Sequence, residues 1–498
     1  MLDIPRRLDQ IITRIDRQSS RLESHISKPS FSERFPFTTQ EAFVLFKQAL
    51  ARLPKEHTGL LQQHSAVAFD SLLWAARNRK MSMLELLSYL KALAEPPARI
   101  RLANATPPAK PKPEQQKLKV LFVTGMFPGV EHGGGLSVFD MIVELASRGH
   151  AVSLYTPEDR KGSAKTLDLL KPHLKSYRLV QQGSFRASDY QSWLRRENTK
   201  FDAIHYVWPN CATLIPAGRD WTRTSLFELI ESCTRRCLID IERFLGARHI
   251  HALEPSTLEL VINWKLEQEA IAASDEVIAL TDMDAQFSSQ VFGVAEVGII
   301  PQGISQTFVL DRVQGEADIA PAFGDQSAVF IGNYNHYPNK DGLLWFLNNV
   351  HDKVLAEVPS FRLVVAGAGD VADIQTPLAA KSSVVFLGEV EDLVGTLQSG
   401  KVCLAPLVSG AGIRGKVNQY SSVCRPTVST RIGACGTPYQ HEKSIMIADD
   451  PNEFASHIVR LITDRSLYET IRSNANKVAI ENFSWKPLIN TLENIYVR

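Results

Sequence analysis

The positions of hydrophobic and polar residues divide the chain into three parts. In residues 1–105, apolar side chains recur every three or four positions with charged residues between them, which predicts amphipathic helices. The first series runs from Ile4 to Leu22, and further helices are expected over 42–53, 64–80 and 81–94. Residues 106–117 are rich in proline and lysine and have no periodicity, so they predict an extended linker.

From Leu118 onward, short apolar runs alternate with amphipathic segments. This alternation predicts buried parallel strands separated by helices, the pattern of doubly wound α/β domains. The first series of expected strands covers 119–124, 152–155, 202–206, 277–280 and 297–300, and the second covers 328–331, 363–366, 384–387, 402–405, 427–429 and 444–447. We therefore expect two Rossmann-like domains, 118–315 and 316–483, and a final helix over 484–498. A ligand cleft should lie between the domains, beyond the carboxyl ends of the strands.

Charge distinguishes the helical region from the rest of the chain. The 498 residues include 55 basic and 54 acidic side chains, so the net charge gives no general reason to bind nucleic acid. Residues 1–106, however, hold 16 basic and 10 acidic side chains. The region 1–105 is expected to pack on itself or on the next domain, or else to dock on a partner, self-associate or contact anionic lipid. The arginines suited to lipid contact are Arg6, Arg7, Arg14, Arg17 and Arg21.

Cysteine usage and hydropathy indicate the compartment. Six cysteines in so long a chain do not make a disulfide framework, and their spacing completes no zinc site. The N-terminal residues contain no apolar stretch of signal-peptide length, and no run of 18 apolar residues occurs. These features predict a cytoplasmic protein, at most peripheral at the inner face of the membrane. They also argue against a two-domain periplasmic binding protein.

Two glycine-rich segments follow expected strands and are suited to binding an anion. Gly133–Gly135 precede a helix whose unpaired N–H groups favour a phosphate, although such loops also serve as plain tight turns. In segment 409–420, Arg414 and Lys416 are framed by glycines where a helix should begin. An arginine fork and a lysine point charge can hold a diphosphate and neutralise the charge that develops as it departs. The alternative is a solvated loop with two surface cations.

These segments, together with others, resemble a known family. In the C-terminal half the resemblance rests on IGNYNHYPNKDGLLWF, VVAGAG, FLGEVEDL, APLVSGAGIRGKV, PTVSTRIGACG and FSWKPL. In the N-terminal half it rests on VLFVTGMFPGVEHGGG, HYVWPN and AASDEVIALTDMD. In this order they resemble retaining glycosyltransferases of GT-B fold, similar to glycosyltransferase family 4 of the surface-polysaccharide group. The resemblance covers about 118–498 and implies two Rossmann-like domains, here with an N-terminal α-helical region.

The resemblance implies that a nucleotide-sugar is bound as donor substrate. Arg414 and Lys416 would hold its diphosphate, and segment 386–392 would receive the base, with Glu391 at the base or ribose. Further donor contacts are implied for Gly134, Gly135, His336, Asn339, Gly388, Gly412 and Ile413.

The chain departs from the family pattern at two places. Many relatives carry two glutamates in the donor segment, where this chain has Ala411 and Gln419; a glutamine still accepts a hydrogen bond from a ribose hydroxyl but carries no charge. On the acceptor side, the family's histidine-containing segment is replaced by one with Asp240 and Glu242. These carboxylates are candidates to face the acceptor, or else ordinary capping or ion-pairing groups. His205 is the remaining acceptor-side candidate, unless it is a buried structural histidine.

A metal ion is not expected. Asp282-Met283-Asp284 has the DxD form with which another glycosyltransferase fold holds Mn²⁺ or Mg²⁺. It directly follows an expected strand and opens a helix, where capping and the helix dipole already favour aspartate.

The expected function is transfer of a sugar from a nucleotide-sugar to a glycan, a lipid-linked saccharide or another hydroxyl acceptor, with retention and without metal or cofactor. A sugar-phosphate or sucrose-phosphate-type synthase is a second enzyme class. A non-catalytic nucleotide-binding or scaffold subunit of a polysaccharide-assembly complex is the alternative outside enzymes.

Overall fold

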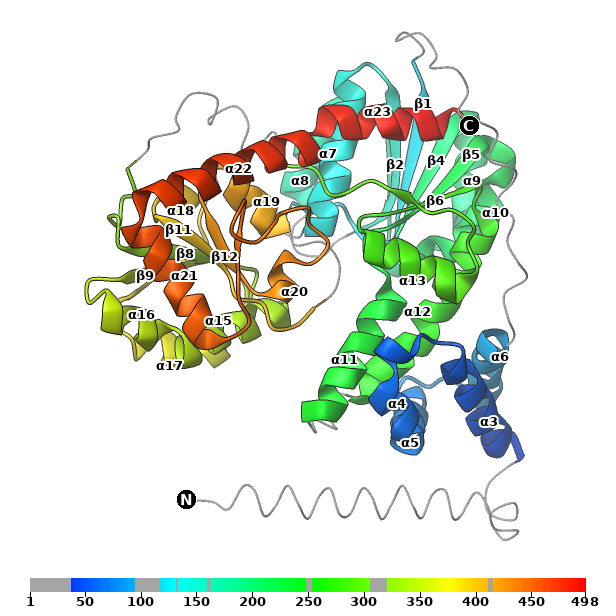
Figure 1. The fold of residues 1–498 in the computed structure, drawn as a ribbon. Helices are drawn as coiled ribbons and strands as arrows, with labels where there is room; N and C mark the ends of the chain where they lie inside the picture. Colours follow the sequence, from blue (N-terminus) through cyan, green and yellow to red (C-terminus); the bar gives the residue numbers. More distant parts are fainter. Residues whose placement is uncertain are drawn as a thin grey trace.

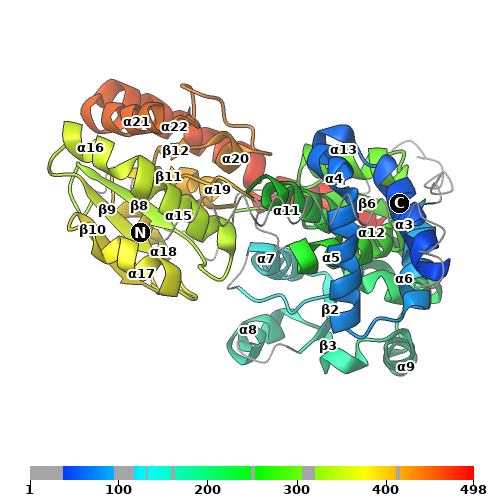
Figure 2. The same ribbon diagram turned by 90° about the horizontal axis from the view of Figure 1, so that it is seen from below.

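Two parallel β-sheets, each flanked by helices, form the two lobes of the molecule (Figures 1 and 2). The computed structural model describes residues 37–94, 117–130, 133–158, 163–247, 253–304, 320–410 and 415–498. The expected helix from Ile4 to Leu22, the five arginines near it, and all but the last residue of the expected linker lie outside these ranges. Within the described ranges, none of the helices combines the length and apolar character that a membrane span requires.

The first sheet has seven strands in the order β3-β2-β1-β4-β5-β6-β7. They are β1 Lys119–Thr124, β2 Ala151–Pro157, β3 Ser176–Val180, β4 Phe201–Val207, β5 Thr222–Leu229, β6 Glu276–Ala279 and β7 Gly298–Ile299. All neighbouring pairs are parallel. The loops that follow the strands therefore gather at one edge of the sheet.

The second sheet has six strands in the order β10-β9-β8-β11-β12-β13. They are β8 Ser327–Ile331, β9 Arg362–Ala366, β10 Val384–Gly388, β11 Val402–Ala405, β12 Thr427–Ser429 and β13 Met446–Ile447. These pairs are also parallel. The expected α/β fold with two doubly wound sheets is confirmed.

Helices connect the strands and cover the sheets. Around the first sheet they are α7 Gly133–Ser147, α8 Ser163–Leu170, α9 Ala187–Glu197, α10 Ile215–Gly218, α11 Cys233–Ala247, α12 Leu253–Ala273 and α13 Asp282–Phe292. In the second half they are α15 Tyr337–Asn349, α16 His351–Glu357, α17 Ala372–Ala379, α18 Leu393–Gln398, α19 Gly415–Ser422, α20 Arg431–Ala434, α21 Pro451–Thr463, α22 Arg465–Phe483 and α23 Trp485–Tyr496.

The last helix, α23, returns to the first sheet (Figure 1). Its apolar side chains Trp485, Leu488, Ile489 and Leu492 belong to the buried cluster that contains Phe122 of β1. The C-terminal end of the chain therefore completes the core of the first lobe.

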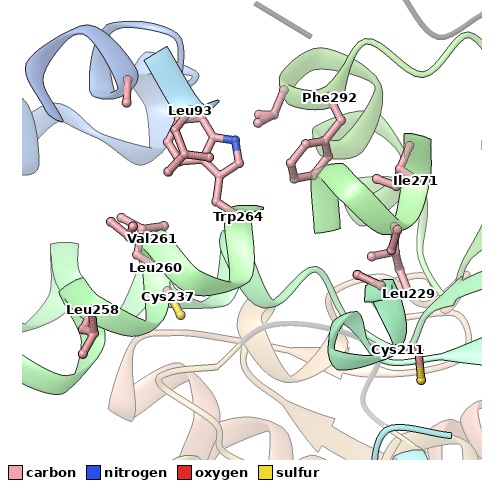
Figure 3. Packing of buried hydrophobic residues seen from close by; sticks show 14 of the residues in the cluster. Leu93, Cys211, Leu229, Cys237, Leu258, Leu260, Val261, Trp264, Ile271 and Phe292 are labelled. Atoms are coloured by element: carbon pink, nitrogen blue, oxygen red, sulfur yellow. The ribbon is translucent and has the colours of Figure 1, made fainter. Parts of the chain in front are cut away.

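Residues 37–94 form an N-terminal helical unit of α3 Phe37–Ala51, α4 Gly59–Gln63, α5 Ser65–Asn78 and α6 Met83–Ala94. The unit packs against α11 and α12 (Figures 1 and 2), and its apolar residues join one buried cluster with α12 and the first sheet. Trp264 of α12 is 1% exposed and lies beside Leu93 (Figure 3), with the Arg52 guanidinium 5.9 Å from its ring. Among the alternatives expected for residues 1–105, the helical unit therefore shows packing on the next domain.

Trp264→Ala should destabilise the helical unit and the first lobe together. Removing a large buried side chain costs about 3–5 kcal/mol, and the cavity would lie in their shared core. Urea unfolding followed by circular dichroism measures the loss. The matched control is Trp74→Ala on α5, because Trp74 is 53% exposed and should cost less than about 0.5 kcal/mol. Similar losses for the two variants would contradict a shared core.

Candidate functional site

Lys416 and Asn339 meet at the carboxyl end of β8. Lys416 is the second residue of α19, and its ammonium group donates to Asn339 Oδ1 at 2.7 Å and to the Ile331 carbonyl at 3.0 Å. The Asn339 amide donates in turn to the Asn333 carbonyl at 2.9 Å. The ammonium also lies 4.6 Å from the centre of the Phe330 ring. These contacts fix a cation at the N-terminal end of a helix, where an anion is favoured.

The N-terminal ends of α7 and α19 meet at Gln302, in the segment that connects the two sheets. The Gln302 amide donates to the Gly133 carbonyl at 2.7 Å. A Cβ atom added to Gly415 would lie 2.9 Å from Gln302 Oε1. Because Gly133 begins α7 and Gly415 begins α19, one side chain that is nearly buried brings together helix ends from both lobes.

Gly134 is enclosed by two side chains at the same edge of the first sheet. A Cβ atom there would lie 2.9 Å from Ile230 Cγ2 and 3.3 Å from Trp208 Cζ2. Trp208 follows β4 with φ 74° and ψ 147°, a backbone conformation that favours glycine. This strained backbone holds the indole against the start of α7.

The structure places the other expected donor residues as follows. Gly412, Ile413, Arg414 and the substituted Ala411 lie outside the described residues. Gly135 is buried in the first turn of α7, and Gln419 is half-buried on α19. His336 precedes α15 and is exposed, Gly388 ends β10 with φ 68°, and Glu391 is exposed in the following loop. Contact of these residues with a nucleotide-sugar stays a prediction.

His205 lies in the core of the first lobe and not at its acceptor edge. It is completely buried in the middle of β4, and its Nδ1 lies 2.8 Å from the Tyr496 hydroxyl of α23. Its Nε2 lies 3.0 Å from the Glu228 carboxylate, and its ring packs on Phe122 with centroids 4.9 Å apart. The geometry fits the structural alternative, because the ring is buried between β1, β5 and α23.

Asp240 and Glu242 both make contacts within the protein. Asp240 is 5% exposed, accepts a hydrogen bond from the Tyr337 hydroxyl, and pairs with Arg236 at 3.5 Å. Glu242 accepts hydrogen bonds from the backbone N–H groups of Leu60 at 3.1 Å and Leu61 at 2.7 Å. Both carboxylates make capping and interhelical contacts, the ordinary roles considered for them.

The Asp282-Met283-Asp284 segment does not fit a metal site. Asp284 is completely buried, accepts a hydrogen bond from the Thr281 hydroxyl at 2.7 Å, and pairs with Arg235 at 3.2 Å. The Thr281 hydroxyl caps α13 by accepting from the Asp284 N–H. A guanidinium beside a buried carboxylate disfavours a second cation there. In the described ranges, no group of three or more potential metal ligands occurs.

Sequence reasoning missed two residues that connect the site. Gln302 stands between Pro301 and Gly303, and Gly303 packs directly on Trp485. A polar residue between a proline and a closely packed glycine was the feature of the sequence that could have identified it. Asp341 pairs with Arg243 of α11 and accepts a hydrogen bond from the Ser409 hydroxyl at 3.4 Å. Its neighbours in the chain give no comparable indication.

Family comparisons agree with this architecture. A family described as Glycosyltransferase Family 4 matches residues 132–308, and one described as Glycosyl transferases group 1 matches residues 325–464. One match lies in the first lobe and the other in the second, and together they cover more than half of the chain. The chain therefore belongs to the glycosyltransferases with the GT-B arrangement, as the resemblance predicted.

One sequence relative is "Uncharacterized 44.6 kDa protein in cps region" of Klebsiella pneumoniae, 27% identical over 173 residues. The match covers 33% of this chain and 45% of that protein, so the chain spans less than half of the relative's length.

Solved structures with a similar fold come from several bacteria. Alr3699/HepE from Anabaena in complex with UDP is 14% identical with a TM-score of 0.56, covering 76% of this chain and 98% of that one. Sucrose-phosphate synthase from Thermosynechococcus elongatus is 14% identical with a TM-score of 0.58 over the same shares. TarM from S. aureus is 11% identical with a TM-score of 0.58, covering 76% of this chain and all of that one. At these identities the similarity shows the fold.

Gly134→Ala should destabilise the first lobe, whereas Gly133→Ala should not. At Gly134 the added methyl group would contact Ile230 and Trp208, and overpacking of this kind costs about 1–3 kcal/mol. At Gly133 the nearest atom would be 3.5 Å away, and alanine in a helix is favoured over glycine by about 0.4–1 kcal/mol. Thermal unfolding of both variants measures the difference. Equal shifts would contradict close packing at Gly134.

Glu267 of α12 anchors the start of α11. Its completely buried carboxylate accepts hydrogen bonds from the Cys233 N–H at 2.5 Å, the Ser232 hydroxyl at 3.1 Å, and the N–H and hydroxyl of Thr234. Burial raises the pKa of Glu267 to about 7, although these hydrogen bonds act in the opposite direction.

The stability of wild type relative to Glu267→Gln should decrease as pH rises. The folded-state pKa of Glu267, about 7, lies above its usual value of 4.5, so between these pH values the folded protein retains a proton that the unfolded chain has released. The contribution of the carboxyl group is therefore complete below pH 4.5 and is lost as pH approaches 7. Urea unfolding of both proteins at about pH 5 and pH 8 measures it. A stability difference that is the same at both pH values would contradict the raised pKa.

Proposed function

We propose that this protein transfers a sugar from a nucleotide-sugar to a hydroxyl acceptor on a glycan, a lipid-linked saccharide or another molecule. The observation that carries the proposal is the fixed cation Lys416 at the start of α19, beside the point where α7 and α19 meet at Gln302. Two helix N-termini and an ammonium group that face one region suit a diphosphate. HepE from Anabaena has been solved in complex with UDP and with UDP-glucose, which supports a donor of this class here.

The proposed reaction proceeds with retention and without a metal ion. The bond between the anomeric carbon and the diphosphate oxygen breaks, the acceptor oxygen bonds to the same face of that carbon, and the acceptor proton moves to the departing diphosphate. Lys416 and the predicted second cation, Arg414, would stabilise the charge on the leaving group. This route needs no strong base from the protein, in keeping with the structural contacts of His205, Asp240 and Glu242.

A non-catalytic nucleotide-binding subunit is the second candidate. It is favoured by the same engaged acceptor-side residues and by Gln419, which stands where many relatives have a glutamate. Both candidates bind a nucleotide, and only the first transfers or hydrolyses the donor sugar.

A thermal-shift screen against UDP, GDP, TDP and their sugars tests binding. A nucleotide that binds the folded state should raise the unfolding temperature, because ligation stabilises that state by mass action. If none of them does so, the proposed function is wrong.

Lys416→Ala should lower sugar transfer by about 10²–10³-fold, because one contact to a developing charge contributes that much. Arg414→Ala tests the other predicted cation in the same assay. Lys381→Ala is the matched control, since Lys381 pairs with Asp352 at 2.6 Å at the opposite end of the second sheet. Wild-type rates in both site variants would contradict the assignment of the diphosphate site. Nucleotide binding by wild type without transfer or donor hydrolysis would select the second candidate.

A further inference from the structure

Helix α11 presents two faces, and each contacts a different part of the molecule. Asp240 and Arg243 are three residues apart and share one face, whereas Glu242 points from another. The first face contacts α15 of the second lobe, and the second contacts the N-terminal helical unit. Figure 2 shows α11 between these two neighbours.

The contact with α15 is built from charged and aromatic groups. The Tyr337 hydroxyl donates to Asp240, and Arg243 forms an ion pair with Asp341. The Arg243 guanidinium also lies 5.2 Å from the centre of the Tyr337 ring. The Arg243 and Asp341 side chains are about one-third exposed, so solvent screens the pair only in part. Tyr337 and Asp341 are four residues apart, which places them on the same face of α15.

Helix α15 also contacts the proposed donor site. Asp341 accepts a hydrogen bond from the hydroxyl of Ser409, which is 3% exposed and begins segment 409–420. Asn339, between the two contact residues, accepts the hydrogen bond from Lys416. The helix that binds α11 therefore also holds residues at both described ends of the proposed diphosphate-binding segment.

The other face of α11 is attached to the helical unit through Glu242. Its carboxylate accepts hydrogen bonds from the N–H groups of Leu60 and Leu61 in the first turn of α4. Hydrogen bonds from backbone N–H groups to an ionised carboxylate are among the stronger ones in proteins.

We propose that Asp240, Glu242 and Arg243 are positioning residues through which the helical unit and α11 set the position of α15, and with it Ser409 and Lys416 at the two described ends of the donor segment. The proposal rests on the proposed function for the identity of the donor. None of the three residues is assigned a contact with substrate. Asp240 and Glu242 thereby receive a role different from the acceptor contacts that the sequence suggested.

Backbone hydrogen–deuterium exchange without nucleotide tests the contact with α15 independently of activity. Arg243→Ala should speed exchange in residues 337–349 and 403–410 by about two- to 150-fold, the range that corresponds to coupling energies between contacting residues. Because alanine also removes packing, Arg243→Met, which keeps much of the side-chain volume without the charge, should speed exchange in the same residues. Unchanged exchange in both variants would overturn the contact.

The helical unit is tested with Glu242→Ala. Exchange should rise at 59–63 and also at 337–349, which lies in the other lobe. The matched control is Lys265→Met on α12, which removes a different contact with the helical unit, the Lys265 ammonium 4.9 Å from the Tyr89 ring. The control should leave 337–349 unchanged. If Glu242→Ala affects only 59–63, the helical unit does not position α15.

Donor kinetics tests the consequence for the site. Arg243→Ala and Glu242→Ala should raise the KM for the nucleotide-sugar several-fold and lower kcat by less than Lys416→Ala does, because they displace the donor segment without removing its cations. A loss confined to kcat would overturn a positioning role. Altered exchange in a protein that binds no nucleotide would leave the interhelical contact in place and refute the proposed function and the link to the donor.

Discussion

The buried carboxylate of Glu267 fixes the direction in which α11 leaves the first sheet. Its hydrogen bonds to Cys233 and Thr234 satisfy N–H groups that a helix start leaves unpaired, in a place that water does not reach. Ile230 comes shortly before Cys233, and its side chain lies close to Gly134 at the start of α7. The turn that Glu267 holds therefore sets the position of the Ile230 side chain as well as the direction of α11.

The two lobes meet through polar and charged groups in addition to packed apolar surface. Arg243 pairs with Asp341, and Asp240 accepts a hydrogen bond from Tyr337; in both contacts each lobe supplies one residue. Gln302, in the segment that connects the lobes, donates a hydrogen bond to Gly133 of the first lobe. Such contacts depend strongly on geometry, so they favour one relative position of the lobes. An extended apolar interface would tolerate sliding more readily. A defined position of the lobes would suit the proposed binding of a diphosphate between helix ends.

The sequence predicted the parts of the fold that depend on local pattern. Buried strands such as β1 and β11 were found with their observed bounds, since each contains four consecutive apolar residues. Strand β3 was missed because it is a half-exposed edge, and β5 because its first half is polar. The partners of Asp240 and Glu242 could not be predicted, since they lie 97 and about 180 residues away in the chain.

Asp240 and Glu242 are engaged in contacts within the protein, so the proposed reaction depends mainly on groups that contact the donor. A carboxylate that already binds a tyrosine hydroxyl, or two backbone N–H groups, would have to lose those partners before it removed a proton. Lys416 is held differently, because its ammonium group donates to two neutral acceptors, Asn339 Oδ1 and the Ile331 carbonyl. A cation that is already fixed in position needs little reorganisation when negative charge develops beside it. These contacts support the proposed reaction, in which the departing diphosphate, stabilised by that cation, also serves as the base.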